Sequence, residues 1–103
     1  MRLTSFLEDG KLTVARTGEI DHHCAKDYIS SITSKIEAYV PDVCVLDFDE
    51  VSFMDSSGIA VIINAMRCMS KMDGSLFVSN LHEQPKKVFE AAGLNKLVNM
   101  MGE

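Results

Sequence analysis

The sequence predicts one α/β domain, in which a mixed, mostly parallel β-sheet of about four strands is covered by helices. Short strand-like segments alternate with segments of helical periodicity, an order typical of parallel sheets covered by helices. The 103 residues fit a single domain. Hydrophobic residues make up 47% of the chain and charged residues 24%, as in an ordinary globular protein and unlike a disordered one.

The first part of the chain is predicted to form a β-hairpin followed by a helix. Residues 3–20 alternate as strands do on both sides of Asp9-Gly10, a dipeptide that favours a tight turn. Asp21 is suited to cap the helix that follows, and Pro41 ends it. The apolar residues of this helix recur at spacings of three and four and so share one face: Ala25, Tyr28, Ile29, Ile32, Ile36 and Tyr39.

The rest of the chain continues the alternation. Residues 42–48 form a short apolar run with β-branched residues, typical of a buried central strand. A helix is predicted from Ser57, a short strand over 75–80, and a third helix over 82–94 with Pro85 in its first turn and Gly93 at its end. The apolar face predicted for the second helix consists of Ile59, Ile62, Ile63, Met66 and Met69.

Two turns in this order lead into the start of a helix, and both carry polar side chains. They are "GEIDHH", residues 18–23, and "FMDSSG", residues 53–58. In open α/β sheets the working surface lies where strands run into helix N-termini. If the two preceding strands are neighbours, both turns therefore lie at one edge of the domain.

Charge and composition exclude several classes of function. The net charge of −5 argues against nucleic acid and against an anionic membrane surface as partners, because both require a basic protein surface. The longest strongly apolar run is about half the roughly 20 residues that span a bilayer. Cys24, Cys44 and Cys68 are odd in number and form no CxxC pair, which indicates reduced thiols in a cytoplasmic protein.

Ser56 and Ser57 allow three interpretations. They could cap the helix, and local physics alone favours this interpretation. One of them could be the nucleophile of a serine hydrolase, but the G-x-S-x-G turn is missing, so a hydrolase is only a remote alternative. They could accept a phosphate, which a helix N-terminus tolerates well because its free N–H groups and dipole favour an anion.

No metal or cofactor site is evident. His22 and His23 are adjacent on the chain, so their side chains would not converge as ligands four residues apart on a helix do. We expect one of them to face solvent or a partner and the other to pack. Glycine-rich phosphate-binding motifs are absent, so the sequence predicts no nucleotide cofactor.

Beyond these patterns, the chain resembles the anti-sigma factor antagonists of the STAS domain family, and most of all the sporulation type. The resemblance rests on "LTVARTGEIDHHCA", on "VLDFDEVSFMDSSGIAVI" with its D-S-S-G motif, and on "KVFEAAGLNKLV". It covers nearly the whole chain, as one STAS domain over residues 1–103. The combination of "GEIDHH" with "FMDSSG" at this separation makes it specific.

The resemblance implies a regulatory protein and not an enzyme. In this family the unmodified protein binds an anti-sigma factor that is also a serine kinase, and binding releases a sigma factor for transcription. Phosphorylation of the first serine of D-S-S-G, which is Ser56 here, turns the protein off, and a serine phosphatase resets it. The implied partner-binding residues are Asp21, His22, Met54, Asp55, Ser57 and Gly58. The alternative is a non-switching STAS scaffold in a larger signalling assembly.

The sequence ends with residues 93–103, whereas the resemblance implies relatives that continue into further elements. The sequence therefore predicts an under-covered apolar patch of Leu97, Val98, Met100 and Met101, and with it a weak homodimer.

Overall fold

The computed structural model describes residues 2–101. Strands and helices alternate along most of this part of the chain. The elements are β1 (Arg2–Glu8), β2 (Lys11–Ile20), α1 (Ala25–Tyr39), β3 (Val43–Asp47), β4 (Val51–Met54), α2 (Ser57–Lys71), β5 (Ser75–Ser79), α3 (Glu83–Ala91), the short 3₁₀ helix η1 (Leu94–Lys96) and β6 (Asn99–Met101).

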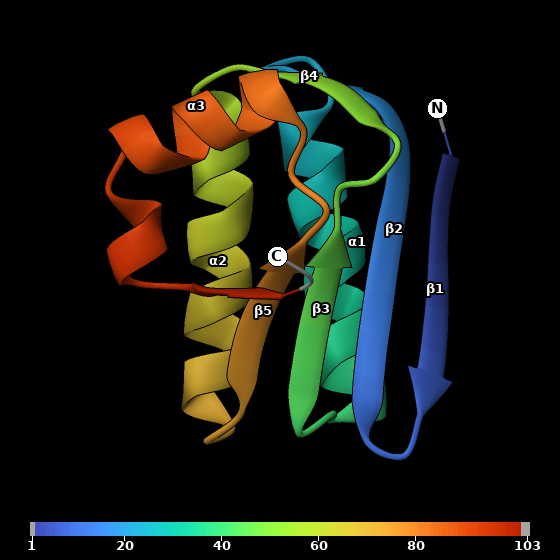
Figure 1. Cartoon of the computed structure of the whole chain (residues 1–103). Coiled ribbons are helices and arrows are strands. Elements are labelled where there is room, and N and C mark those ends of the chain that lie inside the picture. The colour runs from blue at the N-terminus through green and yellow to red at the C-terminus, as the bar shows by residue number, and fades with distance from the viewer. Residues whose placement is uncertain (1, 102–103) are drawn as a thin grey trace.

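The sheet is mixed and mostly parallel, which confirms the predicted fold class. Its strand order is β1-β2-β3-β5-β6, and β4 pairs separately with β2. Only β1 and β2 are antiparallel among the described pairs; the other pairs are parallel. Helices α1 and α2 lie side by side on one face of the sheet, and α3 lies across its end near β4 (Figure 1).

Two strands were not expected from the sequence. β4 has four residues and β6 has three, so neither is long enough to show a clear period-two pattern. β4 carries the chain from the buried strand β3 to the segment before α2, where the predicted site residues lie.

The predicted hairpin turn is confirmed. Asp9 and Gly10 have φ angles of 51° and 79°, and positive φ at both central residues is the mark of a type I′ turn. The turn joins β1 to β2 in a register that pairs Glu8 with Lys11 and Leu3 with Arg16.

The buried face of α2 is rotated from the one that periodicity predicted. The residues buried on α2 are Gly58, Val61, Ile62, Ala65 and Met69, whereas Ile59, Ile63 and Met66 are only partly buried. Small residues on the inner face let the helix lie close to the sheet, and the bulkier side chains at its flanks cover the margins of the core.

The prediction of an exposed apolar patch near the C-terminus is wrong for Val98. Val98 is only 4% exposed and belongs to the core, because its N–H donates to the Leu94 carbonyl at 2.8 Å and folds the segment inward. Leu97 is 62% exposed, as expected. The side chains of Met100 and Met101 lie outside the described residues.

Within the described part of the chain, no helix combines the length and the apolar character needed to cross a bilayer.

Candidate functional site

Pairing between β2 and β4 brings the two polar turns together. Glu19 lies opposite Phe53 and Ile20 opposite Met54 in a parallel register. The Asp55 N–H then donates to the Ile20 carbonyl at 3.1 Å. The turns at residues 18–23 and 53–58 are therefore neighbours at the carboxyl ends of adjacent strands, which meets the condition for both turns to lie at one edge of the domain.

The start of α2 is capped by Asp55 and not by a serine hydroxyl. The Ser57 N–H donates to Asp55 Oδ1 at 2.7 Å, while the Ser56 side chain makes no capping hydrogen bond. Ser56 has φ −63° and ψ −17°, a helical conformation, whereas a capping serine is usually extended. The expectation that the two hydroxyls cap this helix is therefore wrong, and the carboxylate beside them does so instead.

The two serines also differ in exposure. Ser56 is exposed, whereas Ser57, the first residue of α2, is half-buried and therefore less accessible. The Ser56 carbonyl accepts a hydrogen bond from the Ile59 N–H at 3.1 Å, so its backbone is held within the first turn. The site thus presents one exposed hydroxyl on a fixed backbone at a helix N-terminus.

Asp21 organises the neighbouring turn. Its Oδ1 accepts hydrogen bonds from the N–H groups of His23 at 3.0 Å and Cys24 at 3.3 Å, which confirms that it caps the entry to α1. Desolvation raises the pKa of Asp21, but these hydrogen bonds stabilise the charged form more strongly, so the pKa is lowered overall. The turn therefore carries a fixed negative charge beside the Ser56 turn.

Cys24 secures this turn from inside. Its buried thiol lies 3.3 Å from the Glu19 carbonyl, to which it donates, and the Asp21 N–H donates to the sulfur at 3.4 Å. A cysteine at this position gives no recognisable signal in the sequence, because its function depends on a contact across the turn.

His22 and His23 are both exposed, so the expectation that one of them packs is wrong. Their rings lie against each other, with centroids 4.0 Å apart and planes tilted by 38°. Across residues 2–101, no group of three or more His, Cys, Asp or Glu side chains is placed to hold a metal ion.

Met54 and Gly58 support the site from below its surface. Met54 has an exposed fraction of 0%, and a Cβ added to Gly58 would overlap the Cγ and Sδ atoms of the methionine. The glycine therefore makes room for a packed side chain of its own domain. Their contribution is to set the position of α2 relative to β4.

Gln84 holds the outer side of β4. Its Oε1 accepts from the Met54 N–H at 2.8 Å, and its Nε2 donates to the Met54 carbonyl at 2.9 Å. The side-chain amide thus pairs with the strand as a backbone amide would. Sequence reasoning missed this residue, because the contact joins positions 30 apart and no local pattern marks it.

Comparison with known proteins places the chain in the STAS domain family, which it matches over residues 7–102. Among the curated relatives, the anti-sigma F factor antagonist of Lysinibacillus sphaericus is 30% identical over 77 residues, which are 75% of this chain and 66% of that protein. The anti-sigma F factor antagonist of Paenibacillus polymyxa is 27% identical over 89 residues, which are 86% of this chain and 76% of that protein. The matched region thus spans about two thirds to three quarters of these relatives.

A solved structure of the anti-sigma factor antagonist SpoIIAA in its unphosphorylated form has the same fold. It superposes with a TM-score of 0.83 at 24% identity and covers 99% of this chain and 90% of that chain. The phosphorylated form of the Bacillus cell fate determinant SpoIIAA superposes with a TM-score of 0.74, covering 99% and 93% of the two chains. At this level of identity the superpositions establish the fold.

Proposed function

We propose that this domain is a phosphorylation-switched anti-sigma factor antagonist. Its unphosphorylated form binds an anti-sigma factor that is also a serine kinase, and binding releases a sigma factor. Phosphorylation on Ser56 ends the interaction, and a serine phosphatase restores it. The domain itself acts by binding and performs no catalysis.

The observation that carries this proposal is the state of Ser56. Its hydroxyl is exposed and is not used to cap α2, because Asp55 already serves the Ser57 N–H. A kinase can therefore modify Ser56 without breaking a bond that holds the helix. Ser57, which is half-buried, is the poorer acceptor.

A phosphate on Ser56 would act on the interface and leave the fold intact. It adds nearly two negative charges at the N-terminus of α2, where the helix dipole favours an anion by about 0.3–1 kcal/mol. The charges of Asp55 and Asp21 oppose this gain, so the net effect on folding is small. In a complex the same charge would be desolvated against a surface that fits a neutral hydroxyl, and an unpaired buried charge costs several kcal/mol.

The partner surface we propose consists of the two adjacent turns. Asp21, His22, Asp55 and Ser57 lie on or beside it, and the exposed histidine and the fixed carboxylate of Asp21 are suited to polar contacts. Met54 and Gly58 contribute by positioning these turns. The sigma F antagonists among the relatives support a sporulation role, although other relatives, such as that of Bacillus subtilis at 33% identity over 58 residues, are anti-sigma-B factor antagonists.

The proposal is tested with a serine-kinase anti-sigma factor from the same organism, together with ATP and magnesium. Site-localised mass spectrometry should find one phosphate on Ser56, none on the Ser56→Ala variant, and normal phosphorylation of the matched Ser57→Ala control. Phosphate chiefly on Ser57 would contradict the acceptor assignment. Tight kinase binding with no phosphate transfer would instead indicate a non-switching scaffold.

A further inference from the structure

Strand β1 forms an edge of the sheet, and no described strand pairs with its outer side. It pairs with β2 alone, and Figure 1 shows it at the margin of the sheet on the side opposite β3 and β5. The segment Arg2–Glu8 contains no proline, and its charged residues stand only at its two ends, so the five residues between them lack the charges and prolines that commonly protect such edges. Phe6 is 60% exposed and Leu7 is 44% exposed, so the edge is also apolar.

The hairpin register shows which backbone groups of β1 point away from the sheet. Glu8 and Lys11 flank the two-residue turn and therefore form a hydrogen-bonded pair. Hydrogen-bonded and non-bonded pairs alternate along an antiparallel ladder. The N–H and C=O groups of Leu3, Ser5 and Leu7 consequently point outward, in position to meet another strand.

The strand is complementary to itself in antiparallel orientation. A two-fold axis at Ser5 pairs Leu3 with the second copy's Leu7 and Ser5 with the second copy's Ser5. The outward-pointing backbone groups of one strand therefore face those of the other strand. The same register places Thr4 opposite Phe6, and it sets Arg2 opposite Glu8, two positions of opposite charge in the sequence. No other axis position uses the whole strand.

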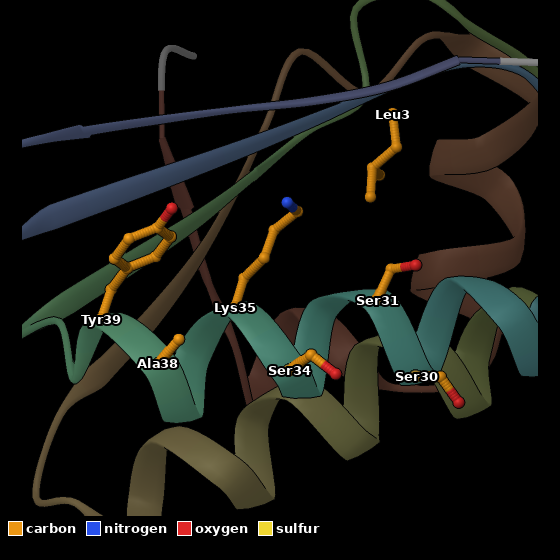
Figure 2. A pocket seen from close by; sticks show the side chains of 7 residues that line it. All are labelled: Leu3, Ser30, Ser31, Ser34, Lys35, Ala38 and Tyr39. Carbon is orange, nitrogen blue, oxygen red and sulfur yellow. The ribbon is translucent and has the colours of Figure 1, made fainter.

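A groove beneath β1 offers space for side chains of a second copy. Leu3 and Leu7 lie opposite Arg16 and Leu12 of β2, so their side chains project to the face of the sheet that α1 covers. Between β1 and α1 lies an open groove of about 420 Å³. Leu3 points into it from the strand, and Lys35 and Tyr39 point into it from the helix (Figure 2).

We propose that β1 is a self-pairing edge, through which two copies of this chain join their sheets across a two-fold axis at Ser5. The second copy's Leu7 lies beside Leu3 at the groove, and the second copy's Leu3 lies beside Leu7. A contact built on one seven-residue strand from each copy is small, and the net charge of −5 on each chain opposes it. The dimer is therefore weak and reversible.

This edge is separate from the Ser56 site. β1 and β4 pair with opposite sides of β2, so the dimer leaves both turns of the candidate site uncovered. Dimerisation is thus independent of Ser56 phosphorylation, and its test does not depend on the proposed function. The surface also differs from the C-terminal patch that the sequence suggested, in which Val98 is buried.

Disulfide trapping tests the register directly. In a Cys68→Ser background, the Ser5→Cys variant places two cysteines opposite each other with Cα atoms about 5.5 Å apart, within the roughly 4.4–6.8 Å of a disulfide. The matched Thr4→Cys variant offsets its cysteines by two positions, about 7 Å along the strand. Mild oxidation should crosslink Ser5→Cys at least about tenfold faster than Thr4→Cys. Equal rates, or faster crosslinking of Thr4→Cys, would overturn the register.

Sedimentation equilibrium between about 10 μM and 1 mM tests the association itself. The average mass should rise from 11.4 kDa towards twice that value. Leu7→Lys should weaken the dimer at least about tenfold, whereas the control Leu97→Lys, also at an exposed leucine, should leave it unchanged. A mass that stays at 11.4 kDa throughout, or a dimer that only Leu97→Lys weakens, would overturn the proposal.

Discussion

Replacement of Asp55 by alanine should destabilise the domain, although Asp55 lies beside Ser56, the proposed acceptor of the phosphate. The Asp55 Oδ1 atom accepts from the Ser57 N–H at 2.7 Å and is the capping side chain that the structure shows at the start of α2. Loss of such a cap costs about 1 kcal/mol, and loss of the negative charge that Asp55 places just before the first turn of α2 adds roughly 0.3–1 kcal/mol.

For a domain of this size, about 1 kcal/mol lowers Tm by about 4–8 °C. Thermal unfolding followed by circular dichroism measures the shift. Ser56→Ala serves as the matched control and should change Tm little, because its hydroxyl makes no capping bond. The reasoning is refuted if Asp55→Ala melts like the wild type while Ser56→Ala melts several degrees lower, since the hydroxyl would then be the true cap.

Substitutions at three further positions test the contacts that support the candidate site and the pH dependence of its stability. Gly58→Ala should destabilise the fold by about 1–3 kcal/mol in urea titration, because the added Cβ would overlap Met54; an unchanged midpoint would show that Met54 moves freely. Gln84→Ala should lower stability by about 1–3 kcal/mol, because it leaves the Met54 N–H and C=O without their amide partner, and Gln84→Glu should restore only the acceptor half of the pair. Asp21 has a lowered pKa, so its ionised form contributes stability above the ordinary value of 3.8, and that contribution disappears as the pH falls through the lowered pKa. Unfolding of Asp21→Asn should therefore differ from the wild type at neutral pH and converge with it in strong acid; a constant difference at all pH values would contradict the charge argument.

The local elements of the fold could be predicted because their signals are local. The Asp9-Gly10 turn, the periodicity of α1 and the buried run of β3 each depend on residues close together in the sequence. The adjacency of the two polar turns could be expected only on the condition that the strands before them are neighbours, and the pairing of β4 with β2 supplies that condition. Short β4 and β6 gave too few residues for a periodic signal.

Details of the site depended on contacts that the sequence does not display. Asp55 and Ser56 are both good capping residues, and the helical backbone of Ser56 decides between them. Gln84 is brought to β4 by the packing of α3, and the Cys24 thiol meets carbonyls across its own turn. These contacts are products of tertiary structure, so residue types alone could not predict them.

The central claim is that phosphate on Ser56 disrupts an interface and leaves the fold unchanged. Calorimetric titration of the kinase partner with the unmodified and the Ser56-phosphorylated protein, combined with thermal melting of both forms, tests it most directly. We expect binding to weaken about a hundredfold or more, equivalent to about 2.8 kcal/mol, with Tm nearly unchanged. Equal affinity for both forms, or a phosphorylated protein that melts far lower, would contradict this account.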